Sequence, residues 1–392
     1  MAPLESIDAT PPFAFHAPVR VLYGAGLAGH AGAKLCEALP GARHALLVTD
    51  VGVREAGISE RIEHALAASG IAAATIAIDG EPDEADVARG ARLLRERPAD
   101  VIVGVGGGSA LDAAKAINVA AHNDGVIRAF AGFDRVPRPG LPFVSVPTTA
   151  GTGSEVGSGM VVTDADARRK YLIVDRRYWP ALALLDPELT VSLPPRPTAW
   201  SGIDALAQAM GALVVNLAHP LMEPTGLGAV RLLGGNLLAV VEDGSDLDAR
   251  LAMQLGSALA GFAMYNAEAG LDHAFAEVVG GAFGMPHGAA VAAFLPLTTE
   301  FTMPAAAASY ARIAREIRDD WAGLGDADAC ERLLGWLRDL TARLGIPSLG
   351  SFGVRAADIP DLVELTLAHF STSISPRELR REDAAGIYER AL

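Results

Sequence analysis

The stretch "DVIVGVGGGSALDAAK", residues 100–115, decides the fold. It opens with an apolar run typical of a buried strand, continues with a run of glycines and ends with helical spacing of apolar residues. Glycines at this junction let the backbone approach a pyrophosphate, and the amides at the start of the helix attract its charge. We expect Ser109 to cap the helix and to donate to the phosphate. A tight strand–helix turn without a ligand is the alternative.

Outward from this stretch, strand-like and helical segments alternate. The strand-like segments are 44–50, 72–80, 100–109 and 141–149, and the helical segments between them are 53–70, 83–98 and 110–123. Such alternation predicts a parallel, doubly wound sheet. After "LPPRP", residues 193–197, the apolar spacing becomes helical almost throughout. We therefore expect an α/β domain over 1–193, an all-helical domain over 194–392, and an active site in the cleft between them.

Composition limits the class of protein. The chain has 392 residues and a formal charge of −15, with no basic cluster that would indicate nucleic-acid binding. Residues 1–18 lack the basic and apolar regions of a signal peptide, and apolar runs such as 287–297 are too short to span a bilayer. The only two cysteines, Cys36 and Cys330, are far apart in sequence. We therefore expect no membrane partner and a reducing, cytoplasmic location.

A second polar loop follows the strand-like segment at 141–149. It reads "PTTAGTGSE", residues 147–155, and carries hydroxyl groups on Thr148, Thr149 and Thr152. Alone it is typical of a polar loop with capping threonines. Two such loops at the ends of adjacent strands together favour a dinucleotide that lies across the edge of the sheet.

A competing glycine motif lies near the start of the chain. "GAGLAG", residues 24–29, is a literal G-x-G-x-x-G after the short strand "VRVLY", and Asp50 follows at a suitable distance for a ribose. The motif is weak in so glycine-rich a chain, because it needs a confirming structural context. The alternative interpretation, a turn leading into a helix, is the one we favour.

Two stretches of the second half hold metal-ligand residue types. "GIDALAQAM", residues 202–210, places Asp204 and Gln208 four residues apart on one helix face. "GLDHAFAEVVGGAFGMPHG", residues 270–288, contains His273, Glu277 and His287. A carboxylate with spaced histidines is typical of a metal site, although each histidine alone is more typical of a core or a helix cap.

The motifs together identify a family. "GGGSALDAAKAI", "PTTAGTGSEV", "LLDPELT", "SGIDAL", "GLDHAFAEVVGGAFGMPHG" and "SPRELRREDAAGIY" occur in that order. From about Phe15 to the carboxyl terminus, the chain resembles the iron-containing (group III) alcohol dehydrogenases, which have the dehydroquinate-synthase-like fold. The resemblance implies that residues 1–193 form a dinucleotide-binding domain and residues 194–392 a metal and substrate domain. It also implies a homodimer that interconverts alcohols with aldehydes or ketones by NAD(P)-dependent hydride transfer.

The resemblance also assigns cofactor residues. Residues matching the two cofactor loops and a lysine that reaches the cofactor are Gly106, Gly107, Gly108, Ser109, Thr148, Thr149, Thr152 and Lys170. Asp112 matches an acidic residue near the nicotinamide end, and we expect it to bind the cofactor and take part in catalysis. Asp50 ends the strand that faces the adenine ribose, where a carboxylate favours NAD over NADP. The resemblance leaves "GAGLAG" as a turn.

The expected iron or zinc site departs from the family pattern. Asp204, His273 and His287 match three ligands, but the fourth position, usually histidine, holds Gln208, whose amide is a weaker donor. We therefore expect an altered ligand set. A further family histidine close to the substrate falls on Glu277, and we expect His273, His287 and Glu277 to serve catalysis.

Three hypotheses follow for this site. Three ligands suffice to bind the metal, or Glu277 replaces the missing ligand, or the site works without metal. The metal-free case favours an activated oxo acid, as in the related maleylacetate reductases, because hydrogen bonds alone must then stabilise the oxygen charge. A dehydroquinate-synthase-like lyase and a cofactor-binding protein with a degraded site are the remaining alternatives.

Overall fold

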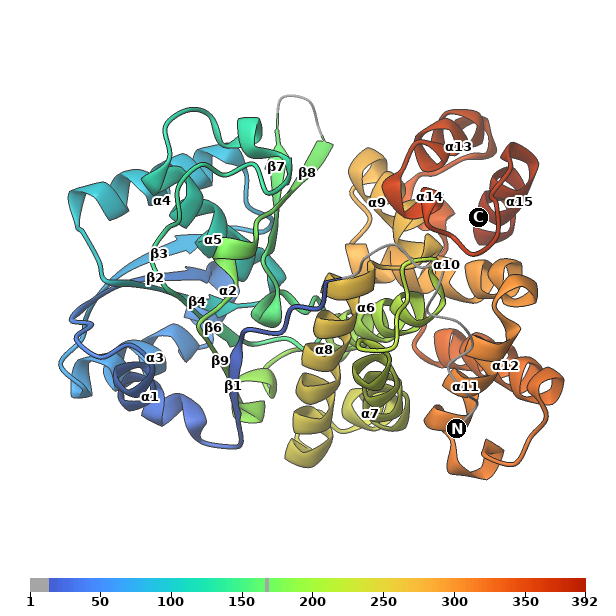
Figure 1. Ribbon diagram of the computed structural model, residues 1–392, viewed down its shortest axis with the longest axis horizontal. Helices are drawn as coiled ribbons and strands as arrows, with labels where there is room; N and C mark the ends of the chain where they lie inside the picture. The colour runs from blue at the N-terminus through green and yellow to red at the C-terminus, as the bar shows by residue number, and fades with distance from the viewer. Residues whose placement is uncertain (1–13, 166–168) are drawn as a thin grey trace.

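The computed structural model describes residues 14–165 and 169–392. Most of the segment that we examined for a signal peptide, residues 1–13, lies outside the described residues. The molecule has two parts that lie side by side, an α/β part and a helical part (Figure 1). This arrangement confirms the predicted fold class.

The α/β part is built on a six-stranded sheet in which every neighbouring pair is parallel. In spatial order the strands are β1 (Arg20–Tyr23), β9 (Leu182–Leu185), β6 (Phe143–Pro147), β4 (Val101–Gly106), β2 (His44–Asp50) and β3 (Ala72–Ile78). Because parallel strands all end at the same edge, the segments after β2, β4 and β6 lie near one another. These segments carry most of the predicted cofactor residues.

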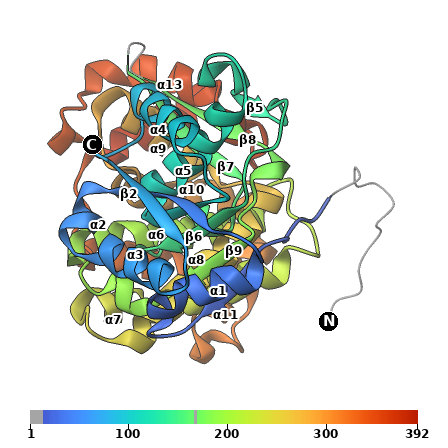
Figure 2. The same ribbon diagram turned by 90° about the vertical axis from the view of Figure 1, so that its left-hand side faces the viewer.

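Helices cover both faces of this sheet, as the doubly wound prediction requires (Figure 2). α1 (Ala31–Ala38) and α3 (Ile58–Ala68) pack on one face, and α4 (Glu84–Glu96) and α5 (Gly108–His122) pack on the other. Neighbouring residues of β2 belong to different faces: Leu47 packs with α1 and α3, and Leu46 packs with α4 and α5. Strands buried on both faces read as continuous apolar runs, which is why the sequence indicates them clearly.

A second, smaller sheet was not predicted. It contains β5 (Gly132–Phe133), β8 (Arg169–Val174) and β7 (Gly159–Asp164), and β7 pairs with β8 antiparallel. β8 is mostly exposed or half-buried and begins with two basic residues, so it lacks the continuous apolar run of the main sheet.

The single helix predicted over 53–70 is wrong in one detail. The structure has two helices there, α2 (Val51–Glu55) and α3, with Gly57 between them. Gly57 has a φ of 74°, in the left-handed region that glycine adopts without strain and that a continuous helix excludes. A glycine inside a helical pattern therefore marks a break here.

The second part of the chain is helical, as predicted. Its helices are α6 (Pro195–Val214), α7 (Glu223–Glu242), α8 (Leu247–Ala267), α9 (Leu271–Phe283), α10 (His287–Thr302), α11 (Ala307–Ile317), α12 (Asp326–Arg343), α13 (Ile359–Leu367), α14 (Phe370–Ser373) and α15 (Arg381–Ala391). The domain boundary that we place after residue 193 stays a prediction.

One described helix, α7, is long and apolar enough to cross a membrane by length and composition alone. This is weak evidence for a membrane span, because helices packed in a protein core pass the same test. α7 packs against α6 and α8, which accounts for its apolar residues.

The "GAGLAG" segment is a structural turn. The amides of Gly26 and Ala28 donate to the Asp186 carboxylate, at N–O distances of 3.2 and 2.7 Å. Asp186 is fully buried and also accepts from the amide of Glu188. The amides that a dinucleotide would need are therefore already satisfied by the chain itself.

We predict that Asp186→Ala lowers the free energy of unfolding by about 2–4 kcal/mol, because it leaves the buried amide of Ala28 and the half-buried amides of Gly26 and Glu188 without an acceptor. Asp100→Ala is the matched control. Asp100 also accepts two backbone amides, from Arg43 and His44, but its side chain is half exposed, so water replaces it at a cost of about 1 kcal/mol. Urea unfolding of both variants measures the difference, and equal losses would contradict the structural role of Asp186.

Candidate metal and cofactor site

Two close helix contacts position the candidate metal site. A side-chain carbon on Gly288 would lie 2.2 Å from the carbonyl oxygen of Trp200, and one on Gly211 would lie 2.2 Å from the amide nitrogen of Gly270. The starts of α10 and α9 therefore lie directly against the backbone of α6, near its two ends. Asp204 lies on α6 between these contacts, opposite the first turns of both helices.

The structure brings the three predicted ligands together. Asp204 Oδ1 lies 3.2 Å from His273 Nε2 and 3.5 Å from His287 Nε2. One ligand atom from each residue lies within 4.8 Å of the others, a separation that suits one shared ion. Asp204 and His273 are buried, and His287 is partly exposed, so the group is reachable from one side.

The unpaired atoms of this group fit a cation. Asp204 Oδ1 and His273 Nε2 are buried and have no hydrogen-bond partner within the described part of the chain. His273 Nδ1 lies 2.6 Å from Asp272 Oδ1, which fixes the ring and leaves Nε2 as the free donor atom. Two buried electron-pair donors facing each other need a positive charge between them, so the residues present fit a divalent metal ion.

The electrostatics agree with this geometry. Burial lowers the pKa of His273, but the neighbouring Asp204 and Asp272 outweigh burial and raise it well above its usual value. Burial lowers the pKa of His287. Asp204 opposes this effect, but the positive neighbours His273 and Lys170 add to it, and the pKa lies below its usual value. The carboxylates around His273 therefore favour a positive charge at this point, which a bound cation would supply in place of a proton, and His287 is neutral, the form that binds metal.

The expected change in the ligand set finds no support in the structure. Asp204, His273 and His287 form a compact triad by themselves. Gln208 Nε2 instead donates to Asp204 Oδ2, with an N–O distance of 3.1 Å, while Gln208 Oε1 has no partner among the described residues. Gln208 thus orients the carboxylate, because it holds one oxygen and leaves the other toward the histidines.

Glu277 does not join the triad. Its Oε2 lies 2.9 Å from His369 Nε2, and no described group of metal-ligand residues includes it. The hypothesis that Glu277 replaces a metal ligand therefore lacks structural support. His369 was missed in the sequence because it lies outside the recognised motifs, six residues before "SPRELRREDAAGIY".

Glu268 is a second residue that the sequence did not indicate. It follows the last residue of α8 as the C-cap, with a φ of 86° and a ψ of 164°, a backbone conformation that residues other than glycine rarely adopt. Such a conformation costs about 1–3 kcal/mol and is concentrated at functional sites. Burial raises the pKa of its carboxyl. The negative charge of Glu277 raises this pKa further, and the positive charge of His273 lowers it.

The two predicted cofactor loops touch each other. A side-chain carbon on Gly108 would lie 2.6 Å from Thr152 Cγ2, and one on Gly107 would lie 3.2 Å from Thr149 Cγ2. Thr148 donates its amide to the carbonyl of Gly106 at 3.0 Å. Only glycines leave room for this contact, which forms a cradle at the amino end of α5 that fits a pyrophosphate.

The predicted helix cap at Ser109 is wrong. α5 begins at Gly108, and its N-cap is Gly107, which makes no side-chain capping bond. Ser109 lies within the first turn. The helix starts earlier than predicted because the close contact with Thr149 and Thr152 fixes the backbone at the glycines.

Asp50 lies beside the glycine loop. It caps α2 by accepting from the Val53 amide at 2.8 Å, and its Oδ2 would lie 2.8 Å from a side-chain carbon on Gly106. Burial raises the pKa of this carboxyl, although the Val53 and Gly52 amides oppose the rise. The carboxylate is therefore next to the loop, where the sequence predicts it to meet a ribose.

Asp112 belongs to a buried cluster that holds the second loop. Its Oδ1 accepts from Ser154 Oγ at 2.5 Å, and its Oδ2 accepts from the Val161 amide at 2.9 Å. The fully buried Lys115, one helical turn later, donates to the carbonyls of Ser154 and Gly159. The structure shows Asp112 supporting the loop together with a lysine that we did not predict, and its place near the nicotinamide stays a prediction.

Lys170 lies on β8, outside the two loops. Its Nζ is 2.6 Å from Glu81 Oε1, and its positive charge acts on His287. Lys170 therefore belongs to the α/β part and its charge affects the triad, and its role toward a cofactor stays a prediction.

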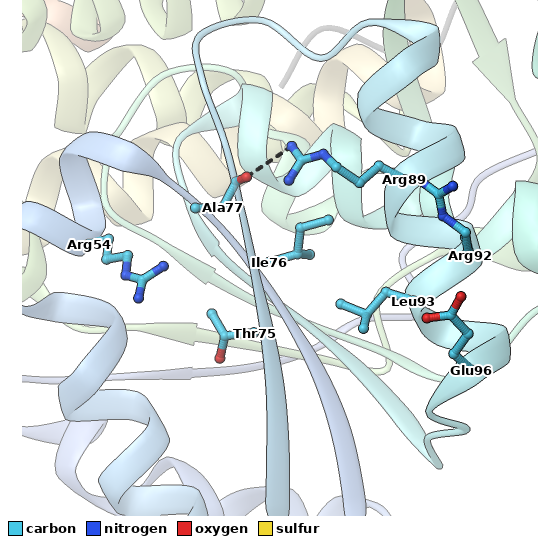
Figure 3. A pocket seen from close by; sticks show the side chains of 8 residues that line it. All are labelled: Arg54, Thr75, Ile76, Ala77, Arg89, Arg92, Leu93 and Glu96. Atoms are coloured by element: carbon cyan, nitrogen blue, oxygen red, sulfur yellow. Dashed lines mark hydrogen bonds between the residues drawn. The ribbon is translucent and has the colours of Figure 1, made fainter.

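A shallow pocket of about 430 Å³ lies elsewhere, at the outer edge of the sheet (Figure 3). It is lined by Arg54, Thr75, Ile76, Ala77, Arg89, Arg92, Leu93 and Glu96, none of which is a predicted site residue. Arg89 donates to the carbonyl of Ala77 on β3, at 3.1 Å. This bond covers part of the exposed edge strand, which protects it from pairing with another chain.

Comparisons with known proteins identify the family of the chain. Family models described as iron-containing alcohol dehydrogenase and as its carboxyl-terminal part match residues 18–187 and 198–392. The chain belongs to the iron-containing alcohol dehydrogenase family. Membership makes it an enzyme of the alcohol dehydrogenase class, so the non-enzyme alternative is wrong.

Individual relatives cover nearly the whole chain. A 1,3-propanediol dehydrogenase of Klebsiella pneumoniae is 36% identical over 91% of this chain and 93% of its own. An NAD-dependent methanol dehydrogenase of Bacillus methanolicus is 34% identical over 96% and 99%. A crystal structure of a 1,3-propanediol oxidoreductase superposes with a TM-score of 0.93 at 34% identity, over 97% of this chain and all of that one.

We predict that Gly288→Ala weakens zinc binding at least about 10-fold and lowers the free energy of unfolding by about 1–3 kcal/mol, because the added carbon meets the Trp200 carbonyl. Gly281→Ala on α9 is the control, since among the described residues its added carbon meets no atom within 4 Å beyond its chain neighbours and its own helix backbone. Competition with a chromogenic chelator and thermal unfolding provide the measurements. Wild-type zinc affinity in Gly288→Ala would show that this contact does not position His287.

Proposed function

We propose that the protein is an NAD-dependent oxidoreductase that interconverts a small alcohol and its aldehyde or ketone, with iron or zinc held by Asp204, His273 and His287. The observation that carries the proposal is the triad with its unpaired buried atoms, Asp204 Oδ1 and His273 Nε2. A bound metal would polarise the substrate oxygen, and the nicotinamide would exchange hydride with the carbon.

Neighbouring residues hold the metal ligands in the orientation that this chemistry requires. Gln208 holds one oxygen of Asp204, and Asp272 holds Nδ1 of His273, so both ligands keep their free atoms directed to one point. Rigid placement of this kind reduces the reorganisation needed when substrate arrives. His287 stays neutral through its lowered pKa and is exposed on one side, where a substrate oxygen can approach.

The cofactor is proposed to lie with its pyrophosphate at Gly106 to Ser109 and its ribose at Asp50. Support comes from the contact between the glycine and threonine loops and from the free capping position of α5. One relative is described as an NAD-dependent methanol dehydrogenase, which supports NAD as the cofactor. A homodimer, a cytoplasmic location and the absence of nucleic-acid and membrane partners remain proposals from the sequence.

The direct test measures NADH consumption with a panel of simple aldehydes. We expect a chelator to reduce turnover at least about 100-fold and added zinc or iron to restore it, because the triad alone supplies no Lewis acid. Metal content measured in parallel confirms removal. Turnover of an activated oxo acid that is unaffected by the chelator would instead support the metal-free reductase.

Cofactor choice gives a separate prediction. We expect Asp50→Ser to raise the ratio of kcat/KM for NADP over NAD at least about 10-fold, because a serine keeps the helix cap but removes the charge that repels a 2′-phosphate. Asp83→Ser is the control, since Asp83 caps α4 in the same way through the Asp86 amide. Equal use of both cofactors by the unmodified protein would contradict the role of Asp50.

A further inference from the structure

Glu277 lies beside the triad without belonging to it. It follows His273 by four residues on α9, so the two side chains share a helix face. The Glu277 side chain is 54% exposed, and its charge interacts with those of His287 and His273. An accessible carboxylate therefore borders the point where the substrate oxygen is proposed to bind.

His369 fixes one oxygen of this carboxylate. The Ser371 amide donates to His369 Nδ1 at 3.2 Å, so in the neutral ring the hydrogen is on Nε2. Nε2 then donates to Glu277 Oε2 at 2.9 Å. Glu277 Oε1 has no hydrogen-bond partner in the part of the chain that the structure describes, which leaves it as a fixed acceptor.

The segment that carries His369 is itself anchored. Phe370, the next residue, packs against Phe133 of β5 with ring centroids 6.2 Å apart. β5 belongs to the α/β part and α14 to the helical part, so this contact joins the two. His369 is thus held where both parts of the molecule meet.

We propose that Glu277, positioned by His369, selects alcohols and aldehydes that carry a second hydrogen-bond donor, either a hydroxyl or an ammonium group, a few atoms from the reacting carbon. The proposal rests on the proposed function and names its substrate class. A carboxylate is an acceptor only, so Glu277 Oε1 pairs with a donor and gains nothing from an alkyl chain.

The strength of the hydrogen bond to Glu277 determines how large the preference between substrates should be. A hydrogen bond to a charged group contributes about 1.5–3 kcal/mol, which corresponds to about 10- to 100-fold in kcat/KM. An alkyl substrate displaces water from the carboxylate without replacing its hydrogen bond, which adds to the discrimination. An ammonium group gains charge attraction as well, whereas a hydroxyl gains only the hydrogen bond.

The experiment compares NAD-dependent oxidation of propan-1-ol, propane-1,3-diol and 3-aminopropan-1-ol by the metal-loaded enzyme. We expect kcat/KM for the diol or the amino alcohol to exceed that for propan-1-ol at least about 10-fold. An advantage for the diol alone identifies a hydroxyl, and an advantage for the amino alcohol identifies an ammonium group. Either result supports the proposal.

Variants separate charge from hydrogen bonding. Glu277→Leu should bring the ratios of kcat/KM between the three substrates close to one, and Glu277→Gln should keep an advantage for the diol and lose that for the amino alcohol. His369→Leu should raise KM for the preferred substrate more than it lowers kcat, and His369→Gln, which retains an N–H donor, should restore it. Glu242→Leu, which removes a surface carboxylate paired with Arg343, is the control.

Equal kcat/KM for all three substrates in the wild type, or unchanged ratios in Glu277→Leu, would overturn the proposal and leave the proposed function intact. Failure to oxidise any of the three alcohols, together with failure to reduce the simple aldehydes, would overturn the proposed function itself. Thermal unfolding of each variant shows whether a lost preference comes from a lost fold.

Discussion

The backbone of α6 is the constraint on which the site depends. Glycines at positions 211 and 288 allow two other helices to approach it so closely that a single added carbon would overlap backbone atoms. Contacts of this kind leave little freedom to shift, because interiors are close-packed. The relative placement of three helices, and hence of Asp204, His273 and His287, follows from them. The two glycines, which lack side chains, therefore contribute as much to the arrangement of the metal ligands as the ligand-bearing residues do.

Close contacts at glycines also join the α/β part to the helical part. A side-chain carbon on Gly153 would lie 2.6 Å from the Cα of Gly261 on α8, and one on Gly151 would lie 2.7 Å from the Cβ of Ser201 on α6. The second cofactor loop therefore rests on the helices that build the triad. A dinucleotide at the loop and an ion at the triad would share one framework, so a shift of α6 would disturb both.

The sequence predicted what local patterns encode. The buried strands, the glycine loop after β4 and the fold class follow from apolar periodicity and turn chemistry. Two of the contacts that it missed are long-range. His369 reaches Glu277 from 92 positions along the chain, and Lys115 bonds to carbonyls about 40 positions away, so no local pattern indicates either partner. Gln208 was misjudged for the same reason, since its bond to Asp204 is visible only when both side chains are placed.

Lys115 gives the α/β part a property that a surface loop would lack. Its ammonium group is buried and surrounded by oxygens from Ser154, Gly157 and Gly159, and burial lowers its pKa. The loop is therefore ordered by the chain's own hydrogen bonds. Immobilising a flexible segment would otherwise consume part of the binding free energy of any ligand. Because the loop is already ordered, ligand binding does not have to order it, and the loss of its conformational entropy occurs during folding instead.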